Sequence, residues 1–154
     1  MENREIKIVR DSEGKAFELA FIVLAILVWV YTVWVFIRLP ETVPVHFGLS
    51  GAPDAYGSRG SILVLGILMT VMGAGMMWGV YYHFKVNLPG VDVCNAGQAA
   101  LAARMTRLMG LTMLLLSAAI VFDTWRGHIL MAFVVLAVLL AICAVFISLI
   151  YKAK

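Results

Sequence analysis

Four long stretches of the 154-residue chain contain no charged side chain, and they constrain its fold more than any other feature. They run over residues 19–37, 61–84, 108–122 and 129–151. A helix needs about 20 predominantly apolar residues to cross the hydrocarbon core of a bilayer. Because 63% of the residues are hydrophobic and 14% are charged, a water-soluble fold of this size could not bury the apolar side chains. The sequence therefore predicts an all-α, polytopic membrane protein with four transmembrane helices and an ordered outer loop rich in Pro and Gly.

The polar segments between these stretches divide the chain into five parts. The expected parts are a cytoplasmic tail over 1–16, a first transmembrane hairpin over 17–84 with its outer loop over 39–60, a cytoplasmic loop over 85–103, a second transmembrane hairpin over 104–151, and a cytoplasmic tail over 152–154. The apolar part of the third span is short. We therefore expect a helix that starts near Asn95 to lead into it, with Arg104 and Arg107 reaching toward the interface.

The distribution of basic residues predicts the orientation in the membrane. The N-terminal tail, the loop before the third span and the C-terminal tail together contain nine Lys and Arg residues, whereas the other side has only Arg38, Arg59 and Arg126. Short loops rich in Lys and Arg stay in the cytoplasm. The sequence therefore predicts a multi-pass protein of the plasma membrane with both termini in the cytoplasm and residues 39–60 outside.

The two cysteines, Cys94 and Cys143, fall in the inner loop and in the last apolar stretch. Since these positions lie at different levels of the membrane, we expect no disulfide and no cysteine metal site. We also expect no cofactor. Most basic residues flank the apolar stretches, so the expected partners are membrane lipids rather than nucleic acid.

The outer loop, LPETVPVHFGLSGAPDAYGSRG, contains three of the four prolines and several glycines, which is typical of an ordered series of turns. The loop also contains an ordered set of residues that resembles a known signature: Leu39, Pro40, Pro44, His46, Phe47, Gly51, Pro53, Asp54, Tyr56, Gly57 and Ser58. This set is similar to that of the membrane domain of unknown function 1648, found at the N-terminus of SdpI-type immunity proteins. The resemblance covers residues 20–82.

This resemblance implies a multispan membrane protein and, for SdpI-type members, protection against a secreted toxin with signalling to a cytoplasmic regulator. We therefore predict a binding, sensing or immunity-type protein that recognises an extracytoplasmic peptide, toxin or lipid through residues 39–60. A small transporter or channel subunit is the alternative, and the hydroxyls that could line its path are Thr32, Thr70, Thr112, Ser117 and Ser148. A metal-dependent envelope enzyme is the second alternative.

Five residues of the loop are the expected ligand-binding or partner-binding residues: His46, Phe47, Asp54, Tyr56 and Arg59. His46 and Asp54 are eight residues apart in a segment rich in turn formers, so they could approach one another across the folded loop. The simpler role for these polar side chains is to tie the loop together by hydrogen bonds. Both roles remain open at the level of the sequence.

The outer segment 123–128 adds two further polar side chains. If the two transmembrane hairpins pack together, Asp123 and His128 would lie on the same face as His46 and Asp54, and these four are the candidates for a metal site. No local spacing resembles a metal motif, and capping of helices is the expected role of Asp123 and His128. We expect no enzymatic activity, because the loop offers a base but no evident nucleophile.

Gly75 and Gly79 form a Gly-x-x-x-Gly pair in the second span. Small residues at this spacing let two helices approach closely. We expect them to pack against a helix of the same chain, with a homo-oligomer as the other use.

Overall fold

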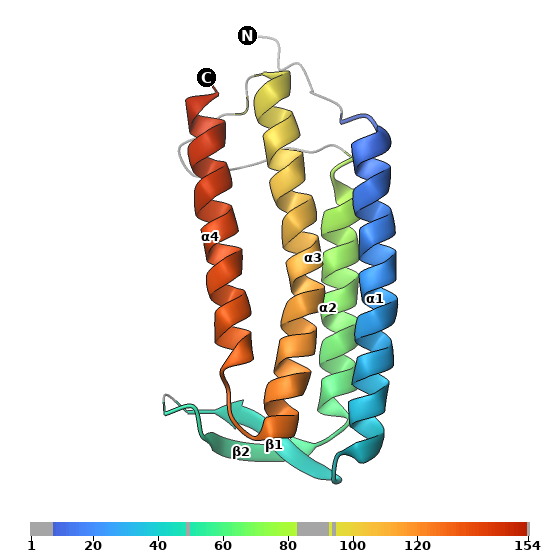
Figure 1. The fold of residues 1–154 in the computed structure, drawn as a ribbon, viewed down its shortest axis with the longest axis vertical. Helices are drawn as coiled ribbons and strands as arrows, with labels where there is room; N and C mark the ends of the chain where they lie inside the picture. The colour runs from blue at the N-terminus through green and yellow to red at the C-terminus, as the bar shows by residue number, and fades with distance from the viewer. Residues whose placement is uncertain (1–7, 49, 83–92, 94, 154) are drawn as a thin grey trace.

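The structure, a computed structural model, describes residues 8–48, 50–82, 93 and 95–153. It contains four helices, α1 (Ser12–Arg38), α2 (Ser61–Gly79), α3 (Ala96–Arg126) and α4 (Met131–Lys152), and two strands, β1 (Thr42–Phe47) and β2 (Pro53–Ser58). The helices run side by side, and the two strands lie across one end of the bundle (Figure 1). We call this the hairpin end, and the end where α1 begins and α4 finishes the terminal end. Cys94, the end of the predicted second span and most of the predicted inner loop fall outside the described residues.

All four helices are long and apolar enough to cross a membrane, which confirms the predicted fold class. The protein is a multi-pass membrane protein. The outer loop differs from the expected series of turns, because most of it forms a two-stranded antiparallel sheet. β-Branched and aromatic residues such as Thr42, Val43 and Tyr56 favour strands, whereas the prolines of the loop favour turns.

Local side chains set the helix ends. The Asp11 carboxylate accepts a hydrogen bond of 2.7 Å from the Gly14 amide, so α1 begins inside the segment assigned to the N-terminal tail. Asn95 caps α3 in the same way, accepting from the Gln98 amide at 2.8 Å. From there α3 continues for 31 residues, so the expected lead-in helix and the third span are one helix.

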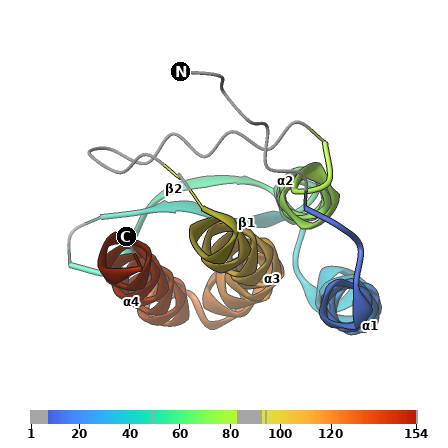
Figure 2. The same ribbon diagram turned by 90° about the horizontal axis from the view of Figure 1, so that it is seen from above.

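Helix α3 is the centre of the bundle. It packs against α1, α2 and α4, whereas the main helix contact of α4 is α3 (Figure 2). In α4 only Ala132 and Ile150 are buried, and the other apolar side chains are exposed or half-buried. Lipid is the solvent that such a helix requires.

Glycines bring α2 and α3 into backbone contact, but they are not the predicted pair. A Cβ atom on Gly73 would lie 2.8 Å from the Gly110 carbonyl oxygen and 2.9 Å from the ring of Phe21. A Cβ atom on Gly75 or Gly79 would have no neighbour within 4 Å. The expected packing of Gly75 and Gly79 within the chain is therefore wrong, because both lie on the face of α2 turned away from the other helices. Their use in a homo-oligomer stays a prediction.

The substitution Gly73→Ala tests this contact, with Gly75→Ala as the matched control. We expect Gly73→Ala to lower the stability by about 1–3 kcal/mol, since the methyl group would force α2 away from α3. Gly75→Ala should leave stability unchanged or raise it by up to about 1 kcal/mol through helix propensity. Thermal unfolding in mild detergent, followed by circular dichroism, measures both; equal melting temperatures for the two variants would contradict the contact.

Candidate functional site

Two irregularities in the pairing of β1 with β2 affect the positions of the predicted site residues His46, Phe47 and Asp54. His46 pairs with Ala55 and Phe47 with Pro53, so Asp54 has no partner in the ladder. A second register shift falls between Pro44 and His46. Such bulges bend a strand and redirect its side chains.

The redirected Asp54 meets His46. The Nδ1 atom of His46 lies 2.5 Å from Oδ1 of Asp54, which confirms that the two side chains can approach one another across the folded loop. Both side chains remain open to the surroundings, with 70% of the His46 side chain and 51% of the Asp54 side chain exposed. The carboxylate orients the imidazole and leaves Nε2 as the free ring nitrogen.

The hairpin backbone is fixed to the bundle at both of its ends. At its base, Nη1 of Arg59 donates to the Leu39 carbonyl oxygen at 2.9 Å, and the Arg59 amide donates to the Glu41 carbonyl oxygen at 2.9 Å. At its turn, the Ile129 amide donates to the Gly51 carbonyl oxygen at 3.1 Å. The turn between α3 and α4 therefore holds the far end of the hairpin.

Close packing strengthens both attachments. Val43 of β1 is 1% exposed and belongs to a cluster with Val35, Leu39, Ile62 and Val121, which joins β1 to α1, α2 and α3. Gly51 has φ of +80°, and a Cβ atom there would lie 2.8 Å from the His128 ring. A side chain at position 51 would thus meet both backbone strain and a clash.

The five predicted binding residues have different surroundings. Tyr56 is 62% exposed on β2, the strand that also contains the exposed Asp54. Phe47 is half-buried at the end of β1. The Arg59 guanidinium bonds to Leu39 and stacks over the Phe36 ring at 4.9 Å. Arg59 therefore ties the loop together, which is the simpler of the two roles expected for it.

The turn between α3 and α4 packs near the hairpin, as expected, and Asp123 has the capping role that was expected of it. Asp123 is 1% exposed, and its two carboxylate oxygens accept the Met131 and Ala132 amides at 3.0 and 2.8 Å. It thereby caps the first turn of α4. Since its oxygens are occupied, Asp123 does not join the His46–Asp54 pair, and the described residues contain no group of three His, Cys, Asp or Glu side chains that could hold a metal ion. The four candidates for a metal site, His46, Asp54, Asp123 and His128, thus do not form one such group.

A polar cluster at the terminal end was not predicted. The Glu18 carboxylate is 4% exposed and accepts hydrogen bonds from Nε of Arg10 at 3.0 Å and from the Tyr81 hydroxyl at 2.9 Å. Nη2 of Arg107, a residue that is 3% exposed, donates to the same hydroxyl at 3.1 Å. Burial, followed by the hydrogen bond to Glu18, raises the pKa of Tyr81, so its hydroxyl stays protonated and continues to donate.

Gly14 is what lets this cluster form, because a Cβ atom there would lie 2.4 Å from the Tyr81 hydroxyl. Gly14 and Glu18 are four residues apart and share one face of α1. That spacing was a signal in the sequence, but the partners Tyr81 and Arg107 come from other helices.

Two of the five hydroxyls considered for a transport path donate to a carbonyl oxygen of their own helix. Thr70 donates to the Gly66 carbonyl oxygen at 2.7 Å, and Thr112 donates to that of Met109 at 2.8 Å. Thr32 and Ser117 are each 1% exposed and lie inside the helix packing. These four side chains fill space between helices.

Comparison with known proteins finds a family match within the first half of the chain. Residues 23–70 match the model of a domain of unknown function, DUF1648, and this segment contains most of α1, the β-hairpin and half of α2. An uncharacterised protein of Archaeoglobus fulgidus is 39% identical over 61 residues, which are 40% of this chain and 33% of that protein. The chain thus matches about a third of that relative's length. No solved structure matches the chain. The predicted resemblance to the domain of unknown function is confirmed, and the assignment to SdpI-type proteins stays a prediction.

The anchoring role of Arg59 is tested by Arg59→Gln, with Arg38→Gln as the matched control. Arg38 is an exposed arginine whose Nη1 donates only within α1, to the Trp34 carbonyl oxygen. Loss of the bond from Arg59 to Leu39 should lower the free energy of hairpin opening by about 1–2 kcal/mol. Hydrogen exchange of the Gly48 and Arg59 amides should therefore become about tenfold faster in Arg59→Gln and change little in Arg38→Gln. Unchanged exchange in Arg59→Gln would contradict the anchoring role.

Proposed function

We propose that this protein is a non-enzymatic recognition module of the membrane, in which the β-hairpin binds a ligand outside the cytoplasm. One contrast supports the proposal. The hairpin backbone is held by Arg59, Val43 and the turn between α3 and α4, while the side chains of His46, Asp54 and Tyr56 are exposed. Binding residues are often displayed in this way, on a short connection fixed by a rigid scaffold.

The exposed side chains fit a peptide or a polar headgroup. The His46–Asp54 pair offers a ring nitrogen and a carboxylate within one contact of 2.5 Å. Tyr56 adds an aromatic face and a hydroxyl, a combination common at binding surfaces. An immunity or sensing role of the SdpI type, with a secreted peptide or toxin as the ligand, is the form of this proposal that the sequence resemblance favours.

The orientation is part of the proposal. The excess of Lys and Arg around the terminal end favours a cytoplasmic location for both termini and puts the hairpin outside the plasma membrane. Ligand binding would then act on a cytoplasmic regulator by shifting α1 or α2, which the hairpin connects directly.

Transport and metal-dependent catalysis are the weaker candidates. A transport path needs polar groups that face a shared channel, whereas Thr70 and Thr112 bond to their own helices. A hydrolase would need a nucleophile or an activated water beside His46. Neither Asp123 nor any other described acid joins His46 and Asp54 in a group that could bind a metal ion.

The test uses a photoreactive phenylalanine analogue at position 56, in cells that naturally produce the protein. The matched control carries the analogue at position 140, since Leu140 is 62% exposed on α4, as Tyr56 is on β2. We expect position 56 to give an adduct of defined mass that is lost when His46→Ala or Asp54→Ala is added, and position 140 to give lipid adducts only. The proposal fails if both positions give the same lipid adducts, or if the adduct at position 56 persists in both alanine variants.

A further inference from the structure

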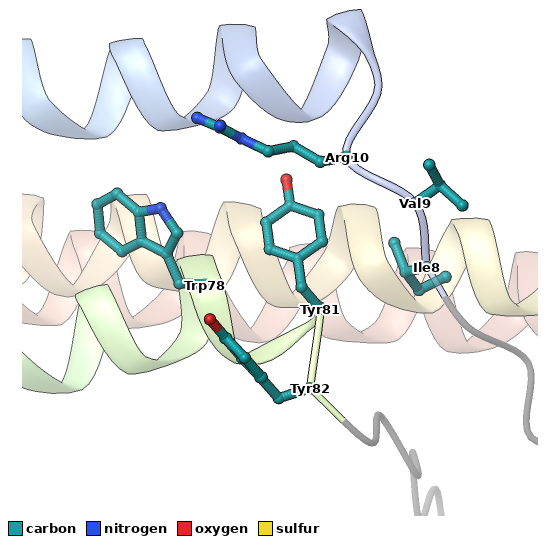
Figure 3. Close-up of a pocket in the computed structure, with 6 residues that line it drawn as sticks. All are labelled: Ile8, Val9, Arg10, Trp78, Tyr81 and Tyr82. Carbon is teal, nitrogen blue, oxygen red and sulfur yellow. The ribbon is translucent and has the colours of Figure 1, made fainter.

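A cavity opens at the terminal end of the bundle, opposite the β-hairpin. Its volume is about 580 Å³, and the residues that line it are Ile8, Val9, Arg10, Trp78, Tyr81 and Tyr82. They come from the segment before α1 and from the end of α2 (Figure 3). The lining therefore combines one cation and three aromatic rings with two aliphatic side chains.

Three hydrogen-bond donors of this lining are unpaired within the part of the chain that the structure describes. Arg10 uses Nε and Nη2 to bind Glu18, which leaves Nη1. The indole N–H of Trp78 and the hydroxyl of Tyr82 also have no hydrogen-bond partner there. In Figure 3 the indole nitrogen points toward Arg10, and the Tyr82 hydroxyl points toward Trp78. The cavity lining thus offers three hydrogen-bond donors to a ligand that accepts hydrogen bonds.

The charges around the cavity favour an anion. Two cations lie at the cavity, since Arg10 lines it and Arg107 contacts the Tyr81 hydroxyl of its lining, whereas one carboxylate, that of Glu18, bonds to the same lining residues. Glu13 forms an ion pair with Arg104, whose Nε lies 2.6 Å from the Glu13 carboxylate, and Glu18 forms an ion pair with Arg10.

Arg107 carries the charge that remains without a carboxylate partner. It contacts the Tyr81 hydroxyl and the rings of Phe17 and Tyr81, and its buried Nε has no hydrogen-bond partner among the described residues. Tyr81 also lines the cavity, so this surplus positive charge lies directly behind the cavity wall.

We propose that this cavity binds a phosphate anion, and specifically the headgroup of an anionic phospholipid. Charged donors such as Arg10 form their strongest hydrogen bonds with phosphate oxygens. Trp and Tyr at the end of a membrane-crossing helix lie at the level of the headgroups, and Trp78 and Tyr82 stand at and just after the end of α2. The aliphatic side chains of Ile8 and Val9 suit the glycerol and the first methylene groups of a lipid. The proposal does not depend on ligand binding by the hairpin.

The experiment measures binding to the full chain, purified in a mild detergent, by native mass spectrometry. The probes are dioctanoyl phosphatidylglycerol, dioctanoyl phosphatidylcholine and glycerol 3-phosphate. We expect the anionic lipid to bind at least tenfold more tightly than the zwitterionic lipid and than glycerol 3-phosphate. Equal binding of glycerol 3-phosphate and phosphatidylglycerol would retain the phosphate site and assign it to a soluble phosphate ester. Equal binding of the two lipids would overturn the proposal.

Two variants locate the bound lipid. Trp78→Phe removes the indole N–H, and Tyr82→Phe removes a hydroxyl from a residue that is 77% exposed, so the latter variant should fold normally. Each should weaken phosphatidylglycerol binding by about three- to tenfold, the usual effect of one lost hydrogen bond. Trp125→Phe, at the hairpin end, is the matched control and should bind as the wild type does. Wild-type affinity in both Trp78→Phe and Tyr82→Phe would overturn the assignment to this cavity.

Discussion

Because the hydrocarbon core of a bilayer offers no hydrogen bonds to a polypeptide backbone, every peptide group within it must find its partner inside the protein. The helices α1 to α4 satisfy this requirement locally, so the amides and carbonyls that need other partners gather at the two ends of the bundle. At the hairpin end they are satisfied by β1–β2 pairing, by the Asp123 carboxylate and by the contact between Ile129 and Gly51. At the terminal end Asp11 and Asn95 cap α1 and α3. The chemistry of the protein is therefore concentrated at these two ends.

The two ends differ in how they use their polar side chains. At the hairpin end, charged and aromatic groups that hold the backbone, such as Arg59, are distinct from the exposed group of His46, Asp54 and Tyr56. At the terminal end, one polar cluster of Glu18, Tyr81 and Arg107 has both functions. It joins α1 to α3 and to the end of α2, and it lies next to an open cavity. A ligand at the first end would contact a rigid surface, whereas a ligand at the second would contact the residues that hold the helices together.

The sequence predicted features that depend on local composition. The four membrane-crossing helices follow from uncharged stretches, and the start of α3 at Asn95 follows from cap chemistry. The sequence also suggested that His46 and Asp54 could approach, but it did not predict strands, because prolines 40, 44 and 53 pointed to turns. The contact itself depends on a register shift beside Asp54, which no residue pattern specifies.

Features that depend on the relative rotation of the helices were either not predicted or predicted incorrectly. The Gly75–Gly79 spacing predicted a close helix contact but not the face of α2 that would make it, and the contact lies at Gly73 instead. The Glu18–Tyr81–Arg107 cluster joins residues from α1, from just after α2 and from α3, so it appears only when those segments are packed together. The capping role expected of Asp123, by contrast, depends on the turn that follows it and is confirmed.

Cysteine labelling measures most directly whether the anchored hairpin displays its exposed side chains outside the membrane. In a chain with Cys94 and Cys143 replaced by serine, single cysteines are placed by Tyr56→Cys and Lys152→Cys, at the exposed face of β2 and the last residue of α4. A membrane-impermeant maleimide should label position 56 in intact cells and position 152 only after the membrane is permeabilised. Labelling of position 152 but not position 56 in intact cells would put the hairpin in the cytoplasm and contradict the account.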